Sequence, residues 1–226
     1  MATEGLFARL SAAAGDDWRA YCHHPFVAGI ANGSLPEPAF RHYLIQDYLF
    51  LIQFARAYAL AAYKADTLDD MRAASATLTA ILDVEMQLHV GYCADWGLSE
   101  AEMAAAPEAL ETTAYTRFVL DRGLGGDSLD LMVALAPCVV GYGEIGSRLA
   151  ADPATAREGN RYASWIEMYA GEEYQDVCTA AVAQLDRLAT ARGGEARFDG
   201  LAKTFAQATR LEIAFWDMGW AARGNG

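Results

Sequence analysis

The chain has 226 residues, of which 54% are hydrophobic and 21% are charged, and its formal net charge is -13. This length suits one domain with a large core, and no linker rich in Pro, Gly and Ser divides it, so we predict a single domain over residues 1–226. The acidic balance argues against nucleic acid and anionic membrane as partners, because both are bound mainly through Lys and Arg.

The N-terminal residues, Met-Ala-Thr-Glu-Gly-Leu-Phe, lack the basic start and apolar core of a secretory signal, so we expect a cytoplasmic protein. No uncharged apolar run reaches the roughly 18 residues of a membrane span, and the longest run, 131–143, is typical of a buried helix. The 4 cysteines contain no CxxC pair, which indicates reduced thiols rather than a disulfide framework or a zinc site. The high hydrophobic fraction indicates a thick core and favours a homo-oligomer.

Apolar residues recur at spacings of three and four along most of the chain, which predicts an all-α fold. His23-His24-Pro-Phe26 is expected to close a turn before the first long helix. Ser34-Leu-Pro-Glu37 combines a capping box with a proline in the first turn, so a long helix should begin there and end near Lys64. Further helices are predicted at 67–95, 108–122, 127–151, 154–170, 172–192 and 196–222, with another capping box at Ser99–Glu102.

Asp47 lies within the aromatic face of the first long helix. Tyr43, Asp47, Phe50 and Phe54 follow one another at helical spacing, so the carboxylate shares its face with rings. Burying an ionised carboxylate without a partner is very costly, so Asp47 should meet a partner, face a wet cavity or take up a proton. A hydrogen bond to another helix would explain one such residue equally well.

Glu85 and His89 are four residues apart on the second long helix, a spacing that can hold one metal ion from two adjacent turns. A helical carboxylate site for metals normally repeats such ligands on several helices, and this chain has only 4 histidines. A hydrogen bond within the core is therefore the favoured interpretation, and no metal is expected.

Pro137 and Cys138 lie inside the apolar helix predicted at 127–151. Proline lacks a backbone donor, and its ring is forced against the carbonyl of Val133, so we expect a bend and free polar backbone groups beside Cys138. Cys138 and Tyr142 are four residues apart and share a helical face. A thiol beside a bent wall suggests a pocket.

Glu212 is the second carboxylate stranded on an apolar stripe, between Ala208 and Phe215 in the last helix. An interhelical salt bridge is the plain structural explanation for it. Two such carboxylates and a thiol in one core nevertheless favour a catalytic site, because nucleophile, acid and base chemistry needs these groups together. Tyrosines suit a pocket for a planar heteroaromatic ligand, although each one separately is ordinary core filler.

Taken in order, these residues resemble the TenA-type thiaminase II family, the aminopyrimidine aminohydrolases. The similarity spans nearly the whole chain and includes His24-Pro-Phe26, Gly33-Ser-Leu-Pro36, Phe40 with Tyr43-Leu-Ile-Gln-Asp-Tyr48, Ala114-Tyr115, Leu135-Ala-Pro-Cys138, Tyr142 with Glu144-Ile-Gly146, Trp165-Ile166 with Tyr169, and Leu211-Glu212 with Phe215-Trp-Asp-Met218. The resemblance implies a haem oxygenase-like helical bundle, a homotetramer and an aminopyrimidine substrate, with no cofactor.

The resemblance also implies roles for individual residues. The nucleophile falls on Cys138, which places the chain in the cysteine-bearing branch, the pyrimidine-reading aspartate falls on Asp47, and the catalytic glutamate falls on Glu212. The pocket tyrosines fall on Tyr115, Tyr142 and Tyr169. One position departs from the family, because Phe50 stands where members often have tyrosine, so a stacking face is kept and a hydroxyl is absent.

These roles predict hydrolysis of the C–N bond on the methylene of an aminopyrimidine, which gives hydroxymethylpyrimidine for thiamin salvage. In this hypothesis the Cys138 thiolate adds to the ring that Asp47 binds, and Glu212 protonates the leaving group and then activates water. A free thiol has a reference pKa of about 8.5, so a neighbour such as Tyr142 or Glu212 is expected to help Cys138 ionise.

Two alternatives stay open. An oxygenase of the same helical bundle would use two metal ions, with candidate ligands Glu85, His89, Glu172 or Glu173, and Glu212. A non-enzymatic protein would bind a pyrimidine in order to sequester it or to serve in regulation. The complete set of Asp, Cys and Glu speaks against the second alternative, because binding alone needs no thiol nucleophile.

Overall fold

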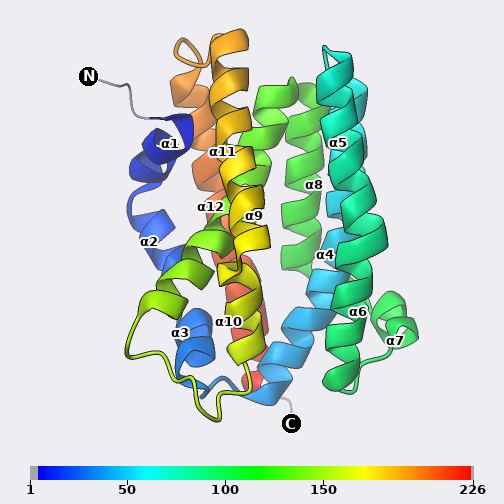
Figure 1. Ribbon diagram of the computed structural model, residues 1–226, viewed down its shortest axis with the longest axis vertical. Helices are drawn as coiled ribbons and strands as arrows, with labels where there is room; N and C mark the ends of the chain where they lie inside the picture. The colour runs from blue at the N-terminus through cyan, green and yellow to red at the C-terminus, as the bar shows by residue number, and fades with distance from the viewer. Residues whose placement is uncertain (1–4, 225–226) are drawn as a thin grey trace.

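The computed structural model describes residues 5–224, and helices account for all the regular structure in that range (Figure 1). The α-helices are α1 (Leu6–Ala14), α2 (Asp16–Cys22), α3 (Pro25–Asn32), α4 (Glu37–Lys64), α5 (Leu68–Ala80), α6 (Met86–Asp95), α7 (Glu100–Ala105), α8 (Leu110–Gly125), α9 (Ser128–Ala151), α10 (Ala163–Ala170), α11 (Glu172–Ala191) and α12 (Phe198–Ala221). The predicted all-α class is confirmed. The ends of the predicted 1–226 domain, residues 1–4 and 225–226, lie outside the described residues.

The first long helix, α4, begins at Glu37 and ends at Lys64 as predicted, but the predicted Ser34 capping box is wrong. Pro36 is the N-cap, and no side chain caps the helix. The reason is steric, because Leu35 precedes a proline and is pushed towards extended backbone, so the helix cannot begin two residues earlier. Ser34 instead donates its backbone N–H to the side chain of Asn32.

The second predicted helix, 67–95, is continuous but contains a π-helical turn. Thr67 caps α5 by accepting the backbone N–H of Asp70 at 3.1 Å. Between α5 and α6 the π-helix η1 (Ile81–Glu85) widens the backbone, and such turns are frequent at functional sites. The capping box predicted at Ser99 and Glu102 is present at the start of α7.

The predicted helix over 154–170 is wrong in its first half, because only α10 (Ala163–Ala170) is helical. The preceding segment is held as turns by Asn160, whose amide donates to the carbonyls of Ile30 and Ala156 and whose oxygen accepts the N–H of Tyr162. These bonds come from the tertiary structure and outweigh local helix propensity. Three short helices also precede residue 34, and the expected turn at 23–26 contains the N-cap of α3, His24.

The helix α9 forms the centre of the bundle and packs against α8, α10, α11 and α12. By length and composition it is apolar enough to cross a membrane, but 89% of its most hydrophobic window is buried inside the molecule, so it is a core helix. Pro137 lies inside this helix and leaves the Val133 carbonyl without its usual N–H partner. Gly146 lets α10 approach closely, because a Cβ there would lie 2.6 Å from Tyr169.

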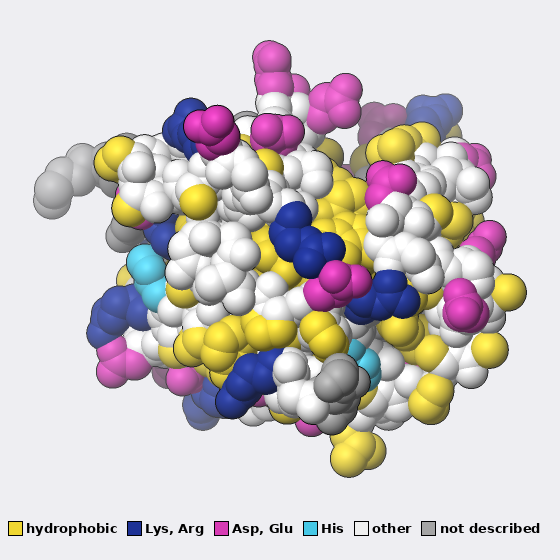
Figure 2. All heavy atoms as spheres, turned by 90° about the horizontal axis from the view of Figure 1, so that it is seen from below, with side chains coloured by type: hydrophobic (Ala, Val, Ile, Leu, Met, Phe, Trp, Pro, Cys, Tyr) yellow, Lys and Arg dark blue, Asp and Glu magenta, His cyan; other side chains and the backbone are white. Residues whose placement is uncertain are grey.

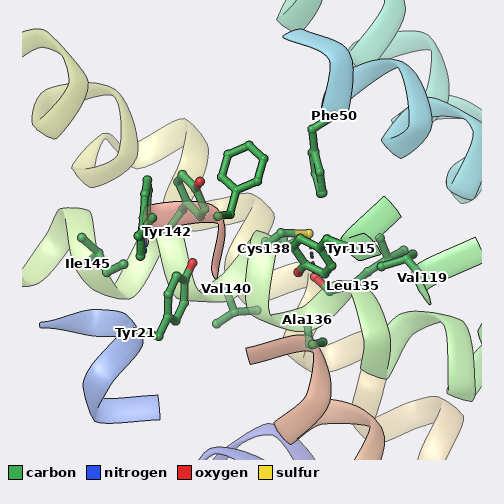
Figure 3. Packing of buried hydrophobic residues seen from close by; sticks show 14 of the residues in the cluster. Tyr21, Phe50, Tyr115, Val119, Leu135, Ala136, Cys138, Val140, Tyr142 and Ile145 are labelled. Carbon is green, nitrogen blue, oxygen red and sulfur yellow. Dashed lines mark hydrogen bonds between the residues drawn. The ribbon is translucent and has the colours of Figure 1, made fainter. Parts of the chain in front are cut away.

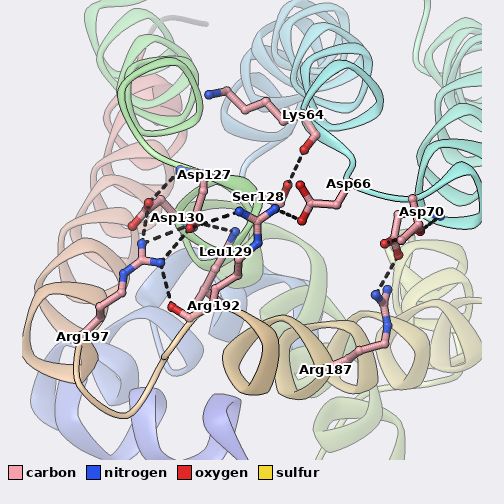
Figure 4. Close-up of polar contacts among 11 residues, drawn as sticks. Lys64, Asp66, Asp70, Asp127, Ser128, Leu129, Asp130, Arg187, Arg192 and Arg197 are labelled. Carbon is pink, nitrogen blue, oxygen red and sulfur yellow. Dashed lines mark hydrogen bonds and ion pairs between the residues drawn. The ribbon is translucent and has the colours of Figure 1, made fainter.

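Charged side chains of both signs lie near one another on the face that Figure 2 shows. One face shows separate Lys and Arg side chains beside acidic and hydrophobic ones rather than a continuous basic area (Figure 2). At one end of the bundle a network joins α9 to the segment before α12 (Figure 4). There Arg197 pairs with Asp127 at 2.8 Å and with Asp130 at 2.7 Å, and Arg192 pairs with Asp66.

Candidate active site

A cavity of about 410 Å³ lies between the helices that the sequence predicted to carry functional side chains. Its walls come from α4, from the α5–η1–α6 segment and from α8 to α12. All seven predicted site residues line it, namely Asp47, Phe50, Tyr115, Cys138, Tyr142, Tyr169 and Glu212. Residues more than 160 positions apart along the chain, Asp47 and Glu212, therefore line the same cavity.

Asp47 lies on α4, and its carboxyl group faces His89 of α6. Its Oδ2 lies 3.6 Å from Nδ1 of His89, whose Nε2 donates to the Leu44 carbonyl at 3.1 Å. Burial raises the pKa of Asp47 to about 7, and a hydrogen bond from Tyr43 acts in the opposite direction. Asp47 thus faces the cavity, has a polar partner and can hold a proton near neutral pH.

Tyr43 is a site residue that the sequence analysis did not assign. Its hydroxyl accepts the indole N–H of Trp165 at 3.3 Å and makes hydrogen bonds with Tyr142 and Tyr169 as well as with Asp47. The signal that could have found it is its position, because Tyr43 precedes Asp47 by one helical turn and shares its face. Tyr43 therefore connects Asp47 to the aromatic wall of the cavity.

Glu212 on α12 is only 1% exposed. Its Oε1 accepts the Tyr115 hydroxyl at 2.9 Å, and among residues 5–224 no Lys, Arg or His forms an ion pair with it. The salt bridge considered from the sequence is therefore not its role in the fold. Burial raises the pKa of Glu212 to about 8, against the effect of the Tyr115 hydrogen bond and together with the nearby Asp47. A carboxyl with this pKa can both give and take a proton near neutral pH.

Cys138 lies at the floor of the cavity, next to Tyr115, and Phe50 points towards both from α4 (Figure 3). Its thiol donates to the Leu135 carbonyl at 3.0 Å. Burial raises the pKa of the thiol well above its ordinary value, and Glu212 raises it further, whereas a hydrogen bond with Tyr115 lowers it. The expectation that Glu212 helps the thiol ionise at rest is therefore wrong, because a negative charge on Glu212 opposes a second one on sulfur.

Aromatic rings form the rest of the inner wall. Tyr142 and Tyr169 pack with ring centres 4.9 Å apart, and Phe50 lies 5.2 Å from Tyr115 and 5.9 Å from Phe215. Ring faces with a few polar groups between them suit a flat heteroaromatic ligand. Phe215 lines the cavity as well, and its one-turn spacing from Glu212 is the sequence feature that places it there.

The residues considered as metal ligands do not converge. Glu85, His89, Glu173 and Glu212 line the cavity, but Glu172 does not. The nitrogens of His89 already face the Leu44 carbonyl and Asp47. Within the described range no three His, Cys, Asp or Glu side chains are grouped closely enough to hold a metal ion. The alternative of a two-metal oxygenase therefore has no ligand cluster in this range to support it.

Comparisons with known proteins agree with this architecture. The model of the TENA/THI-4/PQQC family matches residues 12–222. An aminopyrimidine aminohydrolase of Halalkalibacterium halodurans is 38% identical over 206 residues, which cover 91% of either chain. A crystal structure from a Silicibacter species, described as a TenA family transcription regulator, is 49% identical and has a TM-score of 0.90 over 95% of this chain and 96% of that one.

A more distant structure establishes the fold. A Shewanella denitrificans domain of unknown function, described as having a haem oxygenase-like fold, matches with a TM-score of 0.74 at 12% identity. The match covers 95% of this chain and 92% of that one. The predicted haem oxygenase-like helical bundle is thereby confirmed.

Proposed function

The chain belongs to the TENA/THI-4/PQQC family, and we propose that it is an aminopyrimidine aminohydrolase. The reaction is hydrolysis of the C–N bond on the methylene of 4-amino-5-aminomethyl-2-methylpyrimidine, or of thiamin, to give hydroxymethylpyrimidine. The observation that carries the proposal is one cavity holding a thiol, Cys138, and two carboxyls with raised pKa values, Asp47 and Glu212. The relative from Halalkalibacterium halodurans, named for this activity, adds support.

Asp47 and the aromatic wall bind the substrate in this proposal. A carboxyl group can pair with a ring nitrogen and the adjacent exocyclic amine at once, and Tyr43 and His89 hold Asp47 in place. Tyr142, Tyr169 and Phe50 offer ring faces to the pyrimidine. Because Phe50 lacks a hydroxyl, it stacks without donating a hydrogen bond.

Cys138 and Glu212 carry out the bond changes. The sulfur forms a bond to a ring carbon while its proton passes to the Glu212 carboxylate, which avoids a buried thiolate beside a buried carboxylate. When the substrate is bound as a neutral amine, the C–N bond then breaks and Glu212 returns that proton to the leaving nitrogen; the thiazolium of thiamin instead leaves as neutral thiazole, and Glu212 releases the proton to solvent. Water next adds to the methylene carbon and gives a proton to Glu212. The C–S bond finally breaks, and this proton restores the thiol, so Glu212 acts as base and acid in turn.

Tyr115 supports this exchange from α8. Its hydroxyl donates to Glu212, and the same hydroxyl can turn to stabilise an ionised Cys138 sulfur, which lowers the pKa of that thiol. It thus connects the two groups between which the proton moves. It also keeps the pKa of both groups lower than burial alone would set them.

The cellular setting follows from the same function. We propose a cytoplasmic homotetramer that takes part in thiamin salvage, needs no cofactor, and binds neither nucleic acid nor membrane. The net charge of -13 supports the last point, because phosphate-bearing partners need a basic surface. A binding protein with a regulatory role is the second candidate, and the relative described as a transcription regulator is the observation that keeps it in view.

The test compares turnover of purified protein on 4-amino-5-aminomethyl-2-methylpyrimidine and on thiamin. We expect the aminomethylpyrimidine to give hydroxymethylpyrimidine and ammonia, and to do so faster than thiamin gives hydroxymethylpyrimidine. Binding of both compounds without any product would contradict it and would favour the regulatory binder. Faster reaction of thiamin would keep the hydrolase and change its substrate.

A further inference from the structure

The cavity contains acidic groups that the proposed mechanism does not use. Its lining residues include four carboxyl groups, those of Asp47, Glu85, Glu173 and Glu212, and no Lys or Arg. Asp47 and Glu212 already have roles, which leaves Glu85 and Glu173. To the extent that these carboxyl groups are ionised, a low-dielectric cavity lined by charges of one sign attracts ligands of the opposite sign and repels those of the same sign, and a bound cation favours their ionised forms.

Glu85 is the last residue of the π-helical turn η1 and faces the cavity from the side of α5 and α6. Among residues 5–224 it has no hydrogen bond and no ion pair, although solvent can reach its side chain. Although its side chain is exposed, desolvation by the surrounding cavity wall raises its pKa to about 7, and the nearby Asp47 raises it further. Because no cation of the protein neutralises this carboxyl group, a cationic ligand that binds beside it would form a favourable ion pair and stabilise its ionised form.

Glu173 lies across the cavity in the first turn of α11 and is exposed. The same outer part of the cavity is lined by apolar side chains that solvent also reaches, namely Val84 (54% exposed), Leu88 (65%), Met168 (45%) and Val177 (51%). Glu85 and Glu173 are therefore the charged groups of the mouth, on two different walls. The inner part, around Cys138 and Glu212, is buried.

We propose that Glu85 and Glu173 select ligands whose leaving group is cationic and exclude ligands that carry phosphate. This inference rests on the proposed function and adds to it that the ring binds near Cys138, with the breaking C–N bond next to Glu212, and that the part of the leaving group beyond this bond extends towards the mouth. The thiazolium ring of thiamin can reach such a mouth, and an ammonium group next to Glu212 is attracted from further inside, whereas a phosphate ester of thiamin would face four carboxyl groups without one Lys or Arg in the lining.

The effect is measured as binding to a Cys138→Ser protein, so that no turnover is needed. Calorimetry compares thiamin, thiamin monophosphate and the neutral hydroxymethylpyrimidine in three backgrounds, namely Glu85→Gln, Glu173→Gln and both together. In the double variant the Kd for thiamin should rise about tenfold, the Kd for hydroxymethylpyrimidine should stay within about twofold, and thiamin monophosphate should bind more tightly than before. Glu172→Gln is the matched control, because Glu172 neighbours Glu173 but does not line the cavity.

Two results would overturn the inference. One is a Cys138→Ser protein that binds thiamin monophosphate as tightly as thiamin, and the other is a double variant that weakens the neutral and cationic ligands equally. Benzylammonium and benzyl alcohol are measured in parallel as a cationic and a neutral aromatic ligand. If the pyrimidines fail to bind, the proposed function fails, and the acidic mouth is still judged by whether benzylammonium loses affinity in the double variant while benzyl alcohol does not.

Discussion

Two groups of acidic side chains in this fold have opposite electrostatics. At the end of the bundle Asp127 contacts Arg197, and although burial acts to raise its pKa, the hydrogen bonds it accepts hold that pKa below its ordinary value of 3.8. In the cavity Glu212 meets a tyrosine and rings, and burial raises its pKa to about 8. The comparison shows that a carboxyl group beside an arginine stays ionised and stabilises the fold, whereas a buried carboxyl group without an arginine can exchange protons near neutral pH.

The two groups also affect stability in opposite directions. The pKa of Asp127 is lower in the folded protein than in the unfolded chain. Asp127 therefore contributes to the free energy of unfolding at any pH above its unfolded pKa, and this contribution is lost as the pH falls through its folded pKa. The pKa of Glu212 is higher in the folded protein, about 8, than its ordinary value of 4.5 in the unfolded chain. Its contribution to the free energy of unfolding is therefore fully present below pH 4.5 and is lost as the pH rises through about 8. The cavity acids therefore cost stability in the alkaline range.

The largest effect should come from the cavity thiol. In the Cys138→Ser protein we expect kcat to fall by about a thousandfold or more, because a hydroxyl is a far weaker nucleophile towards an aromatic ring. Rates of hydroxymethylpyrimidine formation measure this. The matched control is Cys178→Ser, a buried thiol that does not line the cavity and should leave kcat within about twofold. Equal loss in both proteins would show that folding, not the nucleophile, explains the effect.

Removing the charge of Glu212 should reverse the stability cost of the cavity. Glu212→Gln keeps an acceptor for Tyr115 but cannot ionise. The free energy of unfolding of the variant, relative to that of the original protein, should therefore rise by on the order of 3 kcal/mol between pH 4.5 and pH 9. Urea unfolding at both pH values measures this difference. A constant difference would mean that Glu212 titrates alike in the folded and unfolded chains.

These two changes concern positions that could be identified from the sequence, and the reason is local. Asp47, Cys138 and Glu212 are polar residues on apolar helical stripes, a pattern visible without coordinates. Glu85 could not be assigned in the same way, because it ends a π-helical turn that shifts the phase of the apolar stripe along the helix. The start of α10 could not be predicted either, because the hydrogen bond from Asn160 to the Ile30 carbonyl at the end of α3 is a tertiary contact.

The ion-paired region should respond in stability and not in activity. Arg197→Ala removes two ion pairs and the N–H donors to Asp127 and Asp130, which are partly exposed, so we expect a loss of about 1–2 kcal/mol. Urea unfolding at pH 7 measures this loss, and kcat should stay within about twofold. Lys203→Ala, which removes an exposed cation on α12, the helix that Arg197 precedes, should change stability by less than about 0.5 kcal/mol. A large fall in kcat for Arg197→Ala would break the separation of the two regions.

The smallest effect should follow from restoring a hydroxyl to the aromatic wall. Phe50→Tyr keeps the ring that packs against Tyr115 and adds one polar group to the cavity, so KM for the aminopyrimidine should change by less than about threefold. Steady-state kinetics with the same substrate measure it. A tenfold or larger change would show that position 50 reads the ligand by hydrogen bonding rather than by stacking.

The central claim is that Glu212 exchanges protons near neutral pH because the cavity buries it without a cation. The most direct measurement is a carbon-13 NMR titration of the side-chain carboxyl groups, with Glu212→Gln used to assign the Glu212 signal. We expect the Glu212 signal to titrate near pH 8, while that of Asp127 titrates below 3.8. A Glu212 midpoint near its ordinary value of 4.5 would contradict this expectation.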